Sequence, residues 1–388
     1  MQALEYEFDS KLRQLHFFNL DEWGGVYRTS PEEEFADYQV SNPGIFRIDR
    51  LPGWPRVKQA ALLRAFRFGT RENQRTARII ASELWIFPFD IAAVSLVVQH
   101  RGSMTSLRNL SLEIKASGEL REYAEQLACS QFADYGCQLL GREDHQYIQI
   151  HQPLKESILE ERYQDITAIL TGDDEQFSDQ YIEEILENAV PYTRHAYAYI
   201  GSRCVIQVHP KIDDLFCLWL LQSAYAKKSQ RVEAFLDARL QGTYQLLSRP
   251  RSFLPLAPFS HSALQRAKPF DGKTLQIVEQ FLTPFEIIGT GFFSLANETI
   301  TDVLDIDAWQ TTIKEKYGDL EDSYEHLENS YSMKNQELVE WLIIIVIILS
   351  ALLTVTVEVD PHIWTAVSGF WKSTVSGWWH AGPAPTHD

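Results

Sequence analysis

The chain has 388 residues, of which 45% are hydrophobic and 23% are charged, and its formal net charge at pH 7 is −18. This length is enough for two folded domains, and the composition is that of a folded protein, which excludes a disordered chain. The negative charge argues against nucleic acid as a partner, because binding to phosphates requires a surface rich in lysine and arginine.

Residues 1–160 mix the alternation of strands with the spacing of helices, which predicts an α+β domain. Helical spacing is found in Val57–Phe66 and in Leu120–Cys129. Strand alternation is found in Gly44–Arg50, Leu110–Lys115 and Gln146–Gln152, and Ser82–Phe87 and Ile91–Val98 are also strand-like.

The N-terminus and the cysteines both indicate a body that is not exported. The first nine residues carry acids where a signal peptide carries bases, and no apolar segment follows them. The four cysteines form no Cys-x-x-Cys pair, so buried thiols in a reducing compartment are expected.

The acidic stretch from Glu156 to Glu187 reads as a solvated helix face or a linker. After it, residues 190–300 predict a second domain that changes from α/β to helical. Its strand material lies in Tyr197–His209, with a turn at Gly201 and Ser202, and helical spacing begins at Ile212.

Residues 304–340 carry a heptad pattern, which predicts an amphipathic stalk helix. Tyrosine recurs at one seam position, while isoleucine or leucine occupies the other. The predicted seam consists of Ile313, Tyr317, Leu320, Tyr324, Leu327 and Tyr331. Its partner is either another helix of the same chain or a second copy, and the sequence does not decide between them.

Residues 341–357 are uncharged and predominantly apolar, which predicts a single transmembrane helix continuing from the stalk. The alternative is a buried core helix. The residues expected in the membrane or at its surface are Trp341, Ile345, Ile348, Leu352, Trp364, Trp371 and Trp378. The last three belong to residues 361–388, a tryptophan-rich tail that either lies in the headgroup plane or forms a return span.

The flanking charges predict the orientation of this span. Lys314, Lys316 and Lys334 precede it, whereas Lys372 alone follows it. The positive-inside rule then places the N-terminal body in the cytoplasm and the short tail on the opposite side.

Motifs for chemistry are scarce. The sequence has no phosphate-binding loop, nucleophile elbow or paired-cysteine zinc pattern, so no cofactor is predicted. His145 and His151 are candidates for a metal or acid–base site, because both positions are odd-numbered along one expected strand. His195, Cys204 and His209 form a second such group.

The segment Leu338-Val-Glu-Trp-Leu-Ile-Ile-Ile-Val-Ile-Ile348 resembles the end of a family of membrane-anchored proteins named for a yeast member required for meiotic nuclear division. The resemblance pairs Glu340 and Trp341 with that family's entry to its span. It implies an α/β body on a C-terminal anchor and no catalytic motif. CorA-type magnesium channels are similar in layout, but their Gly-Met-Asn signature is absent here.

These features predict a non-enzymatic, single-pass membrane protein. Its α+β body would bind a partner or sense a signal, and its stalk would organise or oligomerise it on the lipid bilayer. The first alternative is an oligomeric membrane effector or ion channel, and the second is a membrane-tethered enzyme.

Overall fold

The computed structural model describes residues 6–20, 36–37, 46–49, 56–68, 75–87, 89, 91–131, 137–140, 145–154, 156–193, 196–208, 213–247, 286–289 and 291–359. The chain forms two compact units. Unit 1 consists of Met1–Ala238 and Phe270–Gly318, and unit 2 consists of Arg239–Pro269 and Asp319–Asp388.

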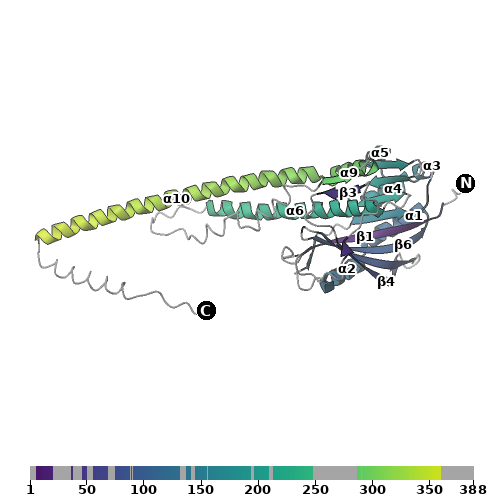
Figure 1. The fold of residues 1–388 in the computed structure, drawn as a ribbon, viewed down its shortest axis with the longest axis horizontal. Coiled ribbons are helices and arrows are strands. Elements are labelled where there is room, and N and C mark those ends of the chain that lie inside the picture. The colour runs from purple at the N-terminus through teal and green to yellow at the C-terminus, as the bar shows by residue number, and fades with distance from the viewer. Residues whose placement is uncertain are drawn as a thin grey trace. The chain divides into compact units, whose positions relative to one another are not determined.

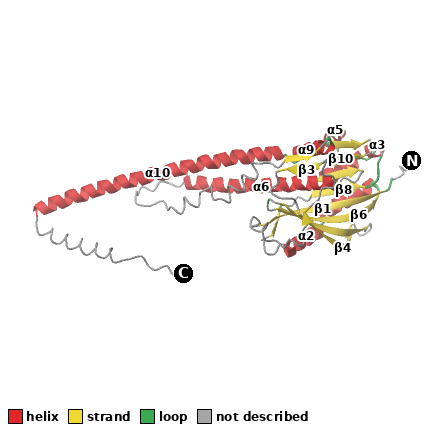
Figure 2. Cartoon of the chain, viewed as in Figure 1, coloured by secondary structure: helices red, strands yellow, loops and turns green. Residues whose placement is uncertain are grey.

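Unit 1 is built on a mixed sheet that has ten strands among the described residues (Figures 1 and 2). The strand order is β2-β4-β5-β6-β1-β8-β11-β10-β9, and β7 pairs with β1 outside this path. The pairing of β8 with β11 is parallel, and the other pairings in this sheet are antiparallel. The strands are β1 (Phe8–Leu20), β2 (Ala36–Asp37), β4 (Arg56–Phe68), β5 (Arg75–Phe87), β6 (Ile91–Gly102), β7 (Cys137–Leu139), β8 (His145–Ile150), β9 (Ala189–Thr193), β10 (Ala196–Ile200) and β11 (Cys204–Val208).

A second, two-stranded sheet pairs β3 (Phe46–Asp49) with β12 (Glu286–Gly289) in antiparallel register. The main sheet centres on β1, which pairs with β6 on one side and with β8 on the other. Neighbouring side chains of β1 point to opposite faces, yet both Phe17 and Phe18 are buried. A strand buried on both faces requires a layer of structure on each side of the sheet.

Helices from the first half of the chain cover one face. The side chains of Leu12, Ile148 and Ile206 belong to one core cluster with Leu107 and Ile166 of the covering helices. These helices are α1 (Met104–Ala116), α2 (Gly118–Gln131), α3 (Glu156–Glu160), α4 (Tyr163–Thr171) and α5 (Asp179–Leu186). The stretch predicted as a solvated helix face or linker thus supplies α3, α4 and α5, and α4 has a buried side.

The long helix α6 (Asp213–Leu247) covers the other face. The ring of Phe216 meets Trp85 at a centroid distance of 5.6 Å and Tyr147 at 5.1 Å. Trp219, one turn further along α6, lies 5.9 Å from the ring of His145. These partners occupy odd-numbered positions on β5 and β8, whereas the core under α1 and α4 uses even-numbered positions on β8.

Two more helices follow. Helix α9 (Phe292–Val303) contacts β9, β10 and β12, and Asn297 accepts a hydrogen bond of 2.8 Å from the side chain of Gln222 on α6. Helix α10 (Ile306–Val359) then runs for 54 residues. The predicted fold class is confirmed at the level of an α+β protein with a mixed sheet and a helical second half.

Two predicted elements are wrong in type. Val57–Phe66 has helical spacing but lies in strand β4, where eleven positions pair with β5. Pairing with a neighbouring strand therefore overrides the helix propensity of its alanines and leucines. Leu110–Lys115 alternates like a strand but lies in α1, because its apolar residues continue a 3- and 4-residue spacing that begins at Met104.

Among the described residues, no helix has both the length and the hydropathy that crossing a membrane requires. The tryptophan-rich tail at 361–388, with Trp364, Trp371 and Trp378, lies outside the described residues. The same holds for the side chain of Tyr331.

Candidate functional site

The end of α10 exposes a continuous apolar surface. Between Trp341 and Leu352, ten large apolar side chains have exposed fractions between 40% and 60%. They are Trp341, Leu342, Ile343, Ile344, Ile345, Val346, Ile347, Ile348, Leu349 and Leu352. Nine of them are consecutive, so they cover every face of the helix. Soluble monomers rarely expose a contiguous apolar surface of this kind, which makes it a candidate interaction surface.

The preceding part of α10 has a different surface. Ile306, Ile313, Leu320 and Leu327 recur every seven residues, and each has an exposed fraction of 4% or less. The first two lie in unit 1 and the last two in unit 2. Since a single chain buries them, residues of the same chain cover this seam. The tyrosines of the other seam position, Tyr317 and Tyr324, are half-buried.

In unit 1, polar contacts join α10 to α6. The Nζ atom of Lys316 lies 2.8 Å from the carboxylate of Glu233 and 2.6 Å from that of Asp237. Desolvation lowers the pKa of Lys316, but the hydrogen bonds to Asp237 and Glu233 outweigh it, so the net shift is upward. Gln310 donates a hydrogen bond of 3.2 Å to the hydroxyl of Tyr225. Burial raises the pKa of Tyr225 to about 12, although the hydrogen bond from Gln310 opposes this rise.

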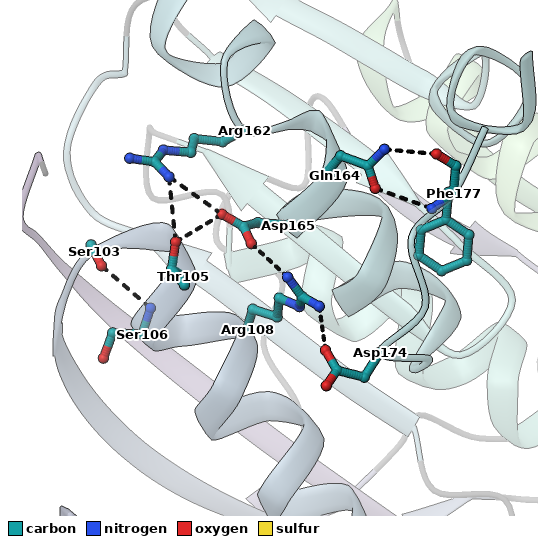
Figure 3. A network of polar contacts seen from close by, with 9 residues as sticks. All are labelled: Ser103, Thr105, Ser106, Arg108, Arg162, Gln164, Asp165, Asp174 and Phe177. Carbon is teal, nitrogen blue, oxygen red and sulfur yellow. Dashed lines mark hydrogen bonds and ion pairs between the residues drawn. The ribbon is translucent and has the colours of Figure 1, made fainter. Parts of the chain in front are cut away.

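A cluster of charged side chains links α1 to α4 and to the loop that follows α4 (Figure 3). Arg108 on α1 donates to Asp165 of α4 at 3.1 Å and pairs with Asp174. Thr105 donates to Asp165 at 3.0 Å, and Arg162 lies 3.7 Å from the same carboxylate. Two arginines thus face two aspartates, and the charge within the cluster is balanced.

The same cluster is held in place by its surroundings. Desolvation lowers the pKa of Arg108, but the hydrogen bonds and charges of Asp165 and Asp174 together outweigh it. The net shift is upward, so this guanidinium stays charged. Beside it, the side-chain amide of Gln164 exchanges two hydrogen bonds, of 2.7 and 3.2 Å, with the backbone of Phe177. We interpret the cluster as a cross-link between helices, because its charges satisfy one another.

The structure separates the two histidines predicted as metal ligands. His145 is buried at the start of β8, where its ring packs against Phe17 at 5.3 Å and against Trp219. His151 is exposed and follows the last residue of β8. Six residues of extended chain span about 20 Å, so the two rings cannot share a metal ion.

The second predicted group is only partly described. Cys204 is buried on β11, and desolvation raises the pKa of its thiol to about 12, although Lys115 opposes this rise. A thiol of that kind is inert at neutral pH. His195 and His209 lie outside the described residues. Among the residues that the structure describes, no three or more His, Cys, Asp or Glu side chains are grouped to hold a metal ion.

A family model matches part of the chain. Residues 56–202 are similar to the N-terminal domain of the uncharacterized protein MJ0711. This segment contains strands β4 to β10, helices α1 to α5, and the charged cluster around Arg108 and Asp165. No curated protein matches the chain, and no solved structure matches it either.

This match corrects the resemblance to the family required for meiotic nuclear division. The matching segment lies in the N-terminal half, not at Leu338–Ile348, and that family is not the one found. The resemblance was misleading for a physical reason. A run of leucine, isoleucine and valine after a Glu-Trp pair is specified by hydropathy alone, and such runs arise in unrelated chains.

The charged cluster around Arg108 and Asp165 was not predicted from the sequence. Arg108 lies 57 positions from Asp165, and nothing in their local patterns indicates that they meet. One signal was available. Ser103 is the N-cap of α1, and its hydroxyl accepts the backbone N–H of Ser106, as serine commonly does at the start of a helix.

Proposed function

We propose that the chain is a membrane-anchored protein, in which the end of α10 inserts into a lipid bilayer and the α+β body binds a partner or senses a signal. In this proposal the body faces the cytoplasm and the earlier part of α10 serves as the stalk. The observation that carries the proposal is the apolar surface from Trp341 to Leu352, which is exposed on every face of the helix.

The distribution of this surface favours lipid over a protein partner. A helix that docks on a protein surface is apolar along one stripe, whereas one that is apolar all round suits a fully apolar environment. Trp341 stands at the entry of the run, where an indole prefers the membrane–water interface. Glu337 and Glu340, which precede it, are exposed.

The polar side chain of Ser350, within the run, is compatible with the same proposal. The hydroxyl of Ser350 donates a hydrogen bond of 2.8 Å to the carbonyl of Ile347, within the helix itself. In hydrocarbon, polar groups have to be satisfied internally in this way. The segment from Leu342 to Leu352 contains nine leucine, isoleucine or valine residues. At about 0.3–0.6 kcal/mol each, they favour insertion by roughly 3–5 kcal/mol.

The uncharged sequence extends beyond the described side chains of the run. The segment from Trp341 to Leu352 extends about 18 Å as a helix. The sequence remains uncharged to Val357, which brings the helical length to about 25 Å, close to the bilayer core of about 30 Å.

Flotation with phosphatidylcholine vesicles tests the anchor. Full-length protein is expected to float with the vesicles and to resist extraction at high pH, whereas a chain that ends at Gln336 is expected to stay in solution. The variant Ile344→Lys/Ile348→Lys should also lose flotation, because each lysine opposes insertion by about 2.5–3.5 kcal/mol.

The matched control is Thr311→Lys/Ser332→Lys, which adds the same charge at two exposed positions on the same helix. This control is expected to float like the unaltered protein. Flotation of the chain that ends at Gln336 would contradict the proposal, since the membrane contact would then reside elsewhere.

A further inference from the structure

One histidine joins two serines at the place where β1, β6 and α1 meet. The Nδ1 atom of His100 lies 3.1 Å from the hydroxyl of Ser10, and its Nε2 atom lies 3.0 Å from the hydroxyl of Ser106. Ser10 and His100 are direct partners in the pairing of β1 with β6. Ser106 is the third residue of α1, beside the cluster shown in Figure 3.

The order of these groups is that of a nucleophile, a base and an orienting group. A serine nucleophile is activated when its hydroxyl donates to one nitrogen of a histidine whose other nitrogen is held by a third group. Here the tautomer with its proton on Nδ1 donates to Ser10 and accepts from Ser106, so one protonation state serves both contacts.

Burial assigns the roles of the two serines. Ser10 is 1% exposed, which suits the group that holds the ring, whereas Ser106 and His100 are partly exposed. Gly102 has no side chain to crowd this pair. A Cβ atom at Gly102 would lie 3.1 Å from Nε2 of His100 and 3.2 Å from the hydroxyl of Ser106.

The start of α1 supplies the electrostatic part of such a site. Ser103 caps the helix and takes the backbone N–H of Ser106 on its hydroxyl and that of Leu107 on its carbonyl. The first amides of a helix, here those of Met104 and Thr105, have no carbonyl partner within the helix. They carry the positive end of its dipole, which stabilises a developing oxyanion.

We propose that Ser106, His100 and Ser10 form a serine-nucleophile site that hydrolyses carboxylic esters. The Ser106 oxygen attacks the ester carbonyl carbon while its proton passes to Nε2 of His100. The bond to the leaving alcohol then breaks, and the alcohol departs with that proton. Water gives a proton to Nε2 and attacks the acyl carbon, the bond to Ser106 breaks, and its oxygen recovers the proton. One ester and one water become one acid and one alcohol.

The neutral orienting group selects the substrate class. A carboxylate in the place of Ser10 would stabilise the imidazolium that forms during attack, and a hydroxyl does so less. His100 is therefore a less effective general base than a histidine held by a carboxylate. Esters are the substrates that such a site accepts, because an alkoxide is a better leaving group than the amine of a peptide.

The experiment is labelling of the full-length protein with a fluorophosphonate probe, followed by peptide mapping. The label is expected on Ser106, and Ser106→Ala should abolish it. His100→Gln should slow labelling by about 100-fold or more, the range of general base catalysis. Ser10→Ala should slow it by a smaller factor. Release of p-nitrophenol from p-nitrophenyl acetate should fall in the same order.

Ser130 is the matched control, since it is an exposed serine on α2 whose hydroxyl donates to the carbonyl of Leu127. Ser130→Ala is expected to change nothing. Peptide mapping of the labelled, unaltered protein tests whether Ser106 is the nucleophile even where a variant fails to fold. Labelling of Ser106 at the rate of Ser130 or slower would overturn the proposal and leave His100 as a link between the sheet and α1.

Discussion

The two parts of helix α10 share one heptad frame and have opposite surfaces. From Ile306 to Leu327 the helix buries an apolar residue at every seventh position and exposes acidic side chains, whereas from Trp341 to Leu352 it exposes apolar side chains on all faces. The first pattern suits a helix that packs on its own chain in water. The second pattern lacks a polar face, which is typical of a helix in a fully apolar environment. In our proposal, one periodicity therefore serves two environments, water and lipid, and the burial of the side chains distinguishes them.

Alanine substitution in the two parts should give the largest contrast. Ile313→Ala removes a fully buried side chain and is expected to lower the free energy of unfolding by about 2–5 kcal/mol. Ile345→Ala removes an exposed side chain and is expected to stay within about 0.5 kcal/mol. Urea denaturation of the detergent-solubilised protein measures both. Equal losses would show that both parts are covered by protein.

A glycine in the first part offers a test of opposite sign. Gly318 lies within α10, and a Cβ atom there would meet nothing within 4 Å. Gly318→Ala is therefore expected to stabilise the protein by about 1 kcal/mol, since alanine favours the helix. Thermal unfolding measures the change.

Gly172 is the control for this substitution. It has a φ of +76°, and an added Cβ would collide with the ammonium group of Lys115. Gly172→Ala should destabilise the protein by about 1 kcal/mol or more. A loss of stability in Gly318→Ala as well would contradict an open, regular helix at that point.

The ion pairs of Lys316 should give the smallest effect. Lys316→Met removes contacts with Glu233 and Asp237 that are partly exposed, so the expected loss is about 0.2–1 kcal/mol per pair. The folded state raises the pKa of Lys316. Its contribution is therefore complete below the unfolded pKa of about 10.4 and is lost as the pH rises through the higher folded value.

Unfolding of the two proteins at pH 7, 9 and 11 checks this prediction. The difference between the unaltered protein and Lys316→Met should be constant from pH 7 to 9 and smaller at pH 11. A difference that grew with pH would contradict the assigned pairs.

The sequence correctly predicted elements with long, regular patterns. It did not predict elements whose conformation depends on pairing with another strand. The heptads from Ile313 to Tyr331 lie in helix α10, and the apolar, strand-like run Ile91–Val98 lies in strand β6. The six residues of Leu110–Lys115 satisfied a strand pattern by chance, and the capping role of Ser103 would have corrected it. In β4, the partner strand determines the conformation, and no local pattern reports its presence.

The candidate sites were less accessible to sequence. The apolar run at Trp341 was visible from hydropathy, although only the structure gives the exposure of each side chain. The proposed site of Ser106, His100 and Ser10 could not be predicted from the sequence. Ser10 and His100 are 90 positions apart, and the antiparallel register of β1 with β6 brings them together.

In our proposal the end of α10 contacts lipid on all its faces. A polarity-sensitive dye attached at successive positions along the helix tests this most directly. Cysteine is placed singly at positions 319–329 and 341–352 in a Cys129→Ser/Cys137→Ser background, and emission is recorded in phosphatidylcholine vesicles. The proposal predicts a blue shift at every position from 341 to 352 and a helical periodicity from 319 to 329. A helical periodicity from 341 to 352 would contradict it, because one face would then be in water.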